Sequence, residues 1–144
     1  MEKFDLGVVG AGPAGYTAAI NAAQQGLKVV LFEKDKPGGV CLNRGCIPTK
    51  TILHSAEVFE DLKCASDIGI FVENAAVDFS KVMEHKDKTV EKLRKSLELM
   101  LKNAGVQIVS AEAKIIDART ITANSQKYEC EKIVSAVGSE PCAL

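Results

Sequence analysis

Two cysteines set five residues apart, Cys41 and Cys46, are the side chains of this 144-residue chain best suited to chemistry. On an ideal α-helix such a pair lies about 140° apart around the axis, with Cα atoms roughly 8.7 Å apart. Because a disulfide tolerates a Cα separation of at most about 7 Å, a bridge here requires a distorted backbone, which Gly45 and Pro48 would permit. A bridge held in that geometry is more easily reduced than a structural one.

The residues of the pair alone leave three interpretations open: two unrelated thiols, part of a zinc site, or a redox-active pair. A zinc site needs two more ligands. We expect no metal site, because the other candidate ligands contain no second closely spaced pair; they are His54, Cys64, His85, Cys130 and Cys142. Both histidines are expected to lie on the surface or on a helix face.

A second motif lies upstream, where residues 10–15 read GAGPAG and have the spacing G-x-G-x-x-G. The apolar, valine-containing run Phe4–Gly10 before it predicts a buried strand, and the alanine-rich segment 14–25 after it predicts a helix that closes at Gly26. The first glycine permits a tight turn, the second leaves room for a pyrophosphate, and the third lets helix and strand pack closely.

A second apolar run, residues 28–32, predicts another strand and is followed by Glu33. A carboxylate at that place can accept hydrogen bonds from a ribose diol. Strand, glycine turn, helix and strand together predict a parallel βαβ unit that binds a dinucleotide. The alternative is a glycine-rich turn that holds no ligand. Lying just downstream of this unit, the cysteine pair is best interpreted as redox-active.

The rest of the chain alternates between helical and strand-like patterns. Residues 42–63 are mostly helical, 64–77 form a connector, and Phe79–Asn103 is a long amphipathic helix capped by Asp78 or Ser80 and ended by Gly105. The predicted buried positions of the first helix are Ile52, Leu53, Ala56, Val58, Phe59 and Leu62. Those of the second are Val82, Val90, Leu93, Leu97, Met100 and Leu101. Short β-rich stretches follow at 106–116, 119–123, 126–129 and 132–137.

Composition excludes several classes of protein. The 47% apolar and 26% charged residues are typical of a globular chain, and a net charge of −1 gives no reason to expect nucleic acid or an anionic membrane as partner. Residues 6–27 lack charge, but their glycines and Pro13 argue against a membrane span. Glu2 and Asp5 argue against a secretory signal. We therefore expect a cytoplasmic protein with mostly free thiols and one catalytic pair.

With these motifs the chain resembles the flavoprotein disulfide reductases, the class I pyridine nucleotide-disulfide oxidoreductases, and within them most closely the dihydrolipoamide dehydrogenases. The resemblance covers nearly the whole chain. It rests on GAGPAG at 10–15, the acidic end of the second strand, GGVCLNRGCIPTK at 38–50, and IVSAVGSEP at 133–141. In the last segment Val137 stands where the family usually has threonine.

The resemblance implies an α/β fold: a Rossmann-like FAD-binding domain over residues 1–144, with a parallel sheet and a small antiparallel β-meander. It implies that FAD is the dinucleotide and that Gly10, Gly12, Gly15 and Glu33 hold its ADP half. The further cofactor contacts that it implies are Pro13, Ala14, Lys34, Gly39, Val40, Cys41, Lys50, Ala113, Val137 and Gly138. Lys50 would lie beside the flavin ring, where a cation stabilises negative charge on the reduced ring.

The resemblance also implies an enzymatic role. Cys41 would be the outer thiol that exchanges with a dithiol, and Cys46 the inner one that faces the flavin. Electrons would pass from protein-bound dihydrolipoamide to the Cys41–Cys46 disulfide, then to FAD and to NAD⁺. The expected partners are a lipoyl-bearing protein of a 2-oxo-acid dehydrogenase or glycine-cleavage complex, and a second subunit in a homodimer. The alternatives are a glutathione- or mercuric-reductase-like enzyme that uses NADPH, and a non-catalytic FAD-binding module.

The same resemblance leaves parts of such an enzyme outside this sequence. The chain has no second G-x-G-x-x-G motif for the nicotinamide cofactor. It also lacks the interface domain that supplies a catalytic base in the family. We therefore expect the chain to be the N-terminal FAD-binding portion of a longer protein, inactive by itself.

Overall fold

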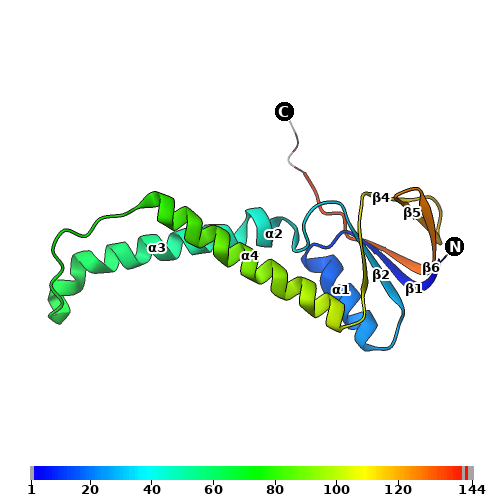
Figure 1. Cartoon of the computed structure of the whole chain (residues 1–144), viewed down its shortest axis with the longest axis horizontal. Helices are drawn as coiled ribbons and strands as arrows, with labels where there is room; N and C mark the ends of the chain where they lie inside the picture. The colour runs from blue at the N-terminus through cyan, green and yellow to red at the C-terminus, as the bar shows by residue number, and fades with distance from the viewer. Residues whose placement is uncertain (1, 141, 143–144) are drawn as a thin grey trace.

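The structure, a computed structural model, describes residues 2–140 and 142. It consists of a mixed sheet of six strands at one end and a helical arm that extends from it (Figure 1). The strand order is β3-β2-β1-β6-β5-β4. Among the described residues, no helix is both long enough and apolar enough to cross a membrane.

The predicted βαβ unit is present. Strand β1 (Glu2–Val9), helix α1 (Pro13–Gln24) and strand β2 (Val29–Glu33) follow one another, and β1 and β2 pair in parallel with Val8 opposite Leu31. The predicted bounds differ from these by only one or two residues. The valine- and leucine-rich sequence of β2 suits a strand that is covered on both faces, and four of its five residues are buried.

The remaining strands extend the sheet on both sides of this unit. Strand β3 (Gln107–Ser110) lies parallel to β2, whereas β6 (Gln126–Ser135) lies parallel to β1 on the other side. Strand β6 also pairs antiparallel with β5 (Thr120–Ala123), and β5 with β4 (Ala113–Ile115). This confirms the predicted class, a Rossmann-like α/β fold with parallel strands and an antiparallel meander.

Two predictions about these strands are wrong. The stretch 106–116 is not one strand but two, because its first part, β3, pairs with β2 and its second part, β4, pairs with β5. The stretches 126–129 and 132–137 are not separate, because β6 runs unbroken through Cys130 and Glu131. The polar residues there had indicated a turn. In the structure Tyr128 and Cys130 point into the core and Glu131 is exposed, so the strand continues its alternation with one face covered.

Two apolar layers hold the sheet, one on each face. The first layer contains an edge-to-face contact between Phe32 and Tyr128, with ring centroids 5.0 Å apart. It is formed by Phe4, Val9, Val30, Phe32, Ile121, Ala123, Tyr128 and Cys130. The second layer packs the sheet against helices α1 and α4. It is formed by Val8, Ala11, Ala19, Val29, Leu31, Leu97, Leu101 and Val106.

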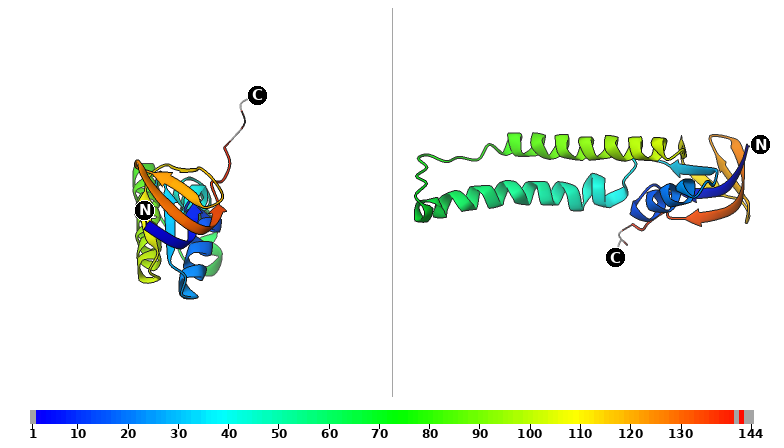
Figure 2. Two further views of the ribbon diagram at one scale, coloured as in Figure 1. Left: turned by 90° about the vertical axis from the view of Figure 1, so that its right-hand side faces the viewer. Right: turned by 90° about the horizontal axis from the view of Figure 1, so that it is seen from below.

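The middle of the chain forms the arm. Helices α2 (Gly39–Arg44) and α3 (Cys46–Cys64) lead out to a short 3₁₀ turn, η1 (Ala65–Ile68), and α4 (Phe79–Asn103) returns to the sheet. Helices α3 and α4 lie side by side along the arm (Figure 2). As predicted, Asp78 caps α4: its carboxylate accepts a hydrogen bond from the Lys81 N–H at 3.2 Å.

The predicted burial of the arm is largely wrong. No residue of α3 is buried, and Leu53, Val58 and Leu62 are exposed. In α4 only Val90, Leu97 and Leu101 of the predicted stripe are buried. Apolar periodicity shows which face of a helix avoids water, but the depth of burial depends on what covers that face. Along the arm, α4 is the long element that lies beside α3 among the residues that the structure describes, whereas the last turns of α4 lie on the sheet.

Candidate functional site

The glycine turn lies between the carboxyl end of β1 and the start of α1, as the motif predicts. Helix α1 sits so close to the turn that a Cβ on Gly15 would lie 1.8 Å from the carbonyl oxygen of Gly10. A side chain at Gly15 would therefore push the helix off the strand. The structure thus gives Gly15 the packing role that the sequence assigns to the third glycine of the motif.

The N-terminus of α1 is suited to an anion. No side chain caps it, Pro13 is its first residue, and its first turn contains no acidic side chain. A Cβ on Gly12 would have only the Cα of Gly39 within 4 Å, at 3.9 Å, so the backbone is open to close approach. Unpaired N–H groups and the positive end of the helix dipole favour phosphate at such a place. The turn therefore fits the pyrophosphate of a dinucleotide.

Glu33 has a structural role that sequence reasoning missed. Its Oε2 accepts a hydrogen bond from the Ala11 N–H at 2.8 Å, and its Oε1 accepts one from the Asp35 N–H at 2.9 Å. The carboxylate thus ties the glycine turn to the loop that follows β2. Each oxygen keeps a second lone pair, so the predicted contact with a ribose diol remains compatible with both hydrogen bonds.

The loop after β2 brings the cysteine segment against the glycine turn. The Gly38 N–H donates to the Ala11 carbonyl at 2.8 Å. Gly39, with φ +63°, lies so near the turn that a Cβ on it would be 2.8 Å from the Cα of Gly12. Lys34 and Val40, two further predicted cofactor contacts, are both exposed; Lys34 precedes Gly38 and Gly39 in the sequence and Val40 follows them.

The two cysteines lie on either side of a helix break. Cys41 lies in α2, Cys46 is the first residue of α3, and Gly45 separates the helices. A Cβ on Gly45 would lie 3.1 Å from the Val40 carbonyl oxygen and 3.3 Å from the Cys41 Cα. Glycine therefore allows the start of α3 to fold back against α2. Pro48 lies in the first turn of α3, where its missing N–H breaks no helical hydrogen bond.

This distorted backbone brings the two sulfurs together. Both residues are thiols in the structure, and their side chains are hydrogen-bonded to one another. That hydrogen bond is the main cause that raises the pKa of the Cys41 thiol above its ordinary value, and partial desolvation adds to the rise. The positive charge of Lys50 lowers the same pKa. Cys46 is the more exposed of the two side chains.

The remaining predicted cofactor contacts lie just after strand β6 and at the start of strand β4. Ala136 joins the turn to β6, because its N–H donates to the Val9 carbonyl at 2.8 Å. Val137 and Gly138 come next, and a Cβ on Gly10 would lie 3.2 Å from the Val137 Cα. Ala113 begins β4, three residues beyond Ser110, which is the register partner of Glu33. Pro141, part of the same motif, lies outside the described residues.

The histidines take no part in this site. His54 and His85 are both exposed on the arm, and His54 Nδ1 lies 3.8 Å from a carboxylate oxygen of Glu57.

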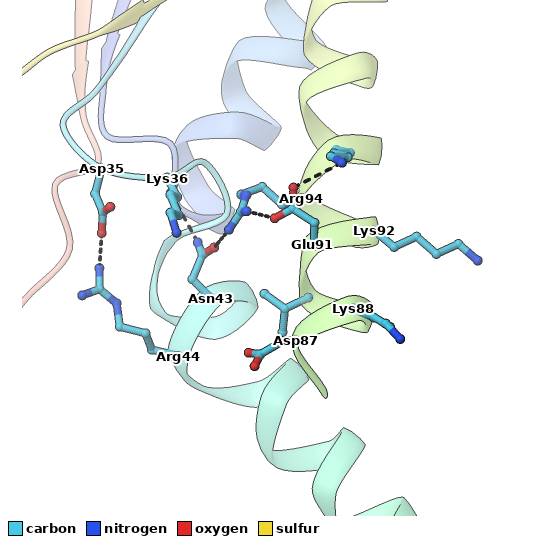
Figure 3. A pocket seen from close by; sticks show the side chains of 11 residues that line it. Asp35, Lys36, Asn43, Arg44, Asp87, Lys88, Glu91, Lys92 and Arg94 are labelled. Carbon is cyan, nitrogen blue, oxygen red and sulfur yellow. Dashed lines mark hydrogen bonds and ion pairs between the residues drawn. The ribbon is translucent and has the colours of Figure 1, made fainter. Parts of the chain in front are cut away.

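Sequence reasoning also missed Asn43, which lies between the two cysteines. Its side chain lines a groove of about 890 Å³ between α2 and α4 (Figure 3). The only sequence signal for it is its place inside the C-x₄-C motif.

Residues 4–144 match the pyridine nucleotide-disulphide oxidoreductase family. The chain belongs to this family. It is 45% identical over 141 residues to a dihydrolipoyl dehydrogenase of Geobacillus stearothermophilus, covering 95% of this chain and 30% of that protein. It is 42% identical over 146 residues to the Bacillus subtilis enzyme of the same name, covering 99% of this chain and 31% of that one.

A solved structure shares the fold. The HOCl-induced flavoprotein disulfide reductase RclA of Escherichia coli, in its Cu(II) complex, aligns with a TM-score of 0.79 and 26% identity, covering 96% of this chain and 29% of that one. These matches confirm the resemblance that the motifs indicated. The chain spans less than a third of the length of each of these three relatives.

Proposed function

We propose that the chain is the FAD-binding part of a dihydrolipoyl dehydrogenase, and that Cys41 and Cys46 are its redox pair. The observation that carries the proposal is the direct packing of the cysteine segment on the dinucleotide turn, through Gly39 and Gly12. The two cysteines thus lie within one short helix of the backbone that would bind phosphate. The identity to dihydrolipoyl dehydrogenases supports this choice over a reductase that uses NADPH.

The residues available for the cofactor fit its parts. The N-terminus of α1 and the backbone of Gly12 would hold the pyrophosphate, and Glu33 the adenosine ribose. Lys34, Val40, Ala113 and the segment around Gly138 would form further contacts, and Lys50 would lie beside the ring. Bound FAD would supply an acceptor for the electron pair that the thiols collect.

The step that this chain's own residues perform is thiol–disulfide exchange. One thiolate of dihydrolipoamide attacks the Cys41 sulfur of the oxidised pair, and the Cys41–Cys46 bond breaks as a mixed disulfide forms. The second substrate thiolate then attacks the substrate sulfur of that mixed disulfide and releases Cys41. Lipoamide leaves as a disulfide, both cysteines are reduced, and two electrons have moved to the pair.

The whole enzyme extends beyond these residues. We propose NAD⁺ as final acceptor, a lipoyl-bearing protein of a 2-oxo-acid dehydrogenase or glycine-cleavage complex as partner, and a homodimer as the assembled form. The name of the relatives, dihydrolipoyl dehydrogenase, supports a lipoyl-bearing partner, and the family resemblance supports NAD⁺ and the homodimer. The groups that would bind NAD⁺ and complete the site belong to the remaining length of such a protein.

Disulfide mapping tests the redox pair. We expect oxidised lipoamide to convert Cys41 and Cys46 to a disulfide, identified by mass spectrometry of peptides, and dihydrolipoamide to reverse it. Cys64, exposed at the end of α3, is the internal control and should remain alkylatable throughout. Idle thiols would instead give no Cys41–Cys46 bridge at any ratio of lipoamide to dihydrolipoamide.

A further inference from the structure

The side chain of Asn43 lies where three segments meet. Its Nδ2 is 3.0 Å from the Gly39 carbonyl oxygen, 3.1 Å from that of Pro37 and 3.3 Å from that of Lys36. Its Oδ1 accepts a hydrogen bond from Arg94 Nη1 of helix α4 at 3.5 Å. One amide thus joins the loop after β2, helix α2 and helix α4 (Figure 3).

The chemistry of these contacts requires an amide. Three carbonyl oxygens converge on one end of the side chain and need N–H donors there, whereas the guanidinium at the other end needs an acceptor. A neutral amide offers two donors and one acceptor oxygen on a short side chain. A carboxylate would present only acceptors to the carbonyls, and an apolar side chain would satisfy neither end.

The loop that Asn43 holds is the one that touches the glycine turn. Its carbonyls converge because Gly38 and Gly39 both adopt positive φ, +109° and +63°. In that conformation Gly38 donates to the Ala11 carbonyl and Gly39 approaches Gly12. Helix α2 follows this loop directly, and Asn43 lies on it two residues after Cys41.

The other end of the Asn43 amide contacts helix α4, whose last turns pack on the sheet. Arg94 forms an ion pair with Glu91 one turn earlier on α4, and its side chain is only 15% exposed. Its neighbours Val90 and Leu97 are buried, so this part of α4 is fixed by packing. Asn43 therefore connects α2 to two supports, the glycine turn through the loop and the core through Arg94.

We propose that Asn43 is a positioning residue for the thiol pair: it holds α2 on the loop and on α4, so that the Cys41 sulfur stays against the Cys46 sulfur across the break at Gly45. This inference rests on the proposed function. The hydrogen bonds at 36–39 fix where α2 begins, and the break at Gly45 leaves only such contacts to hold its orientation relative to α3.

The test replaces Asn43 with a neutral side chain of similar size, Asn43→Leu, in the full chain. We expect the equilibrium constant for forming the Cys41–Cys46 disulfide in glutathione buffers to fall about tenfold, because the sulfurs are no longer held together. The pH midpoint for alkylation of reduced Cys41 should also move down toward that of an ordinary thiol, because the hydrogen bond with Cys46 raises it. Circular dichroism must show that the variant is folded, because unfolding would also give Cys41 the midpoint of an ordinary thiol; in a folded variant, lower stability alone would not cause the second change.

Asn21→Leu is the matched control, because the Asn21 amide donates to the Thr17 carbonyl on the exposed surface of α1, away from the pair. It should leave both readouts unchanged. Arg94→Gln, which weakens the other end of the same contact, should shift both in the direction of Asn43→Leu but less, and it keeps the test valid if Asn43→Leu does not fold.

The outcomes distinguish a failure of the role of Asn43 from a failure of the proposed function. The role of Asn43 is overturned if folded Asn43→Leu forms the Cys41–Cys46 disulfide as well as the wild-type chain does and has an unchanged Cys41 midpoint. If Asn43→Leu does not fold, the same result in Arg94→Gln overturns it. Either result leaves the proposed function intact. A wild-type chain that forms no such disulfide overturns both.

Discussion

At the scale of residues, the chemistry of Cys41 is set by its immediate neighbours. Gly45 lets Cys46 approach, the Cys46 thiol raises the Cys41 pKa, and Lys50 lowers it. The sequence indicated the pair, the need for a distorted backbone and the residues that permit it. It could not indicate Asn43, because an asparagine inside a helix is ordinary until the carbonyls that face it are known.

The charge of Lys50 leads to a prediction about pH. Because the ammonium favours the Cys41 thiolate, Lys50→Gln should move the midpoint for alkylation of Cys41 to higher pH. The measurement is the rate of iodoacetamide alkylation at Cys41 as a function of pH, followed by mass spectrometry. Lys63→Gln, near the far end of α3 and paired with Glu60, is the control and should leave the midpoint unchanged. An unchanged or lower midpoint in Lys50→Gln would show that the lysine does not act on this thiol.

At the scale of elements, patterns that are local in sequence predicted well and contacts between elements did not. The βαβ unit, the span of α4 and its cap follow from apolar runs, glycines and Asp78, which act within a few residues. The predicted burial of α3 was wrong, because its own sequence does not indicate how little of its surface α4 covers along the arm. The mostly helical stretch expected over 42–63 consists of two helices, α2 and α3, because Gly45 ends α2.

The packing of α1 on β1 can be tested at two glycines of one motif. Gly15→Ala should lower the free energy of unfolding by about 1–3 kcal/mol, because its Cβ would overlap the Gly10 carbonyl oxygen. Gly12→Ala is the matched control: its Cβ meets nothing closer than 3.9 Å, so the stability should hardly change. Urea denaturation followed by circular dichroism compares the two. Equal stabilities would contradict the tight approach of the helix to the turn.

The turn between β4 and β5 should contribute stability that depends on pH. The Arg119 N–H donates to Asp117 Oδ1 at 2.8 Å, and this bond, followed by one from the Thr120 side chain, lowers the Asp117 pKa. A lowered folded-state pKa stabilises the protein above the unfolded-state pKa, and this contribution disappears as pH falls through the folded-state value. Asp117→Asn should therefore be less stable than wild type at pH 7, with the difference vanishing in acid. A difference that persists unchanged at low pH would have another cause.

At the scale of the whole molecule, the two ends of the chain build the sheet and the middle builds the arm. Strand β6 lies beside β1 although more than a hundred residues separate them in sequence. Local patterns predicted that strands lie near both ends of the chain. Together with the family resemblance, they also predicted the fold class. They could not give the strand order, because pairing over that distance depends on the two apolar layers of the assembled sheet, of which one is shared with α1 and α4.

The arrangement of the molecule brings its two motifs to one place. The turn at 10–15 and the pair at 41 and 46 meet because β2 and its loop return the chain to the end of β1, where Glu33 and Gly38 both bond to Ala11. This juxtaposition is the central claim, since a redox pair serves a flavin only at close range.

An absorption spectrum under anaerobic conditions tests that claim most directly. The chain, or a longer protein that contains it, is loaded with FAD and given about two electron equivalents of dihydrolipoamide. We predict a long-wavelength band from a thiolate beside the oxidised flavin, present in Cys41→Ser and absent in Cys46→Ser. A protein that binds FAD but shows no such band, or shows it equally in Cys46→Ser, would contradict the account.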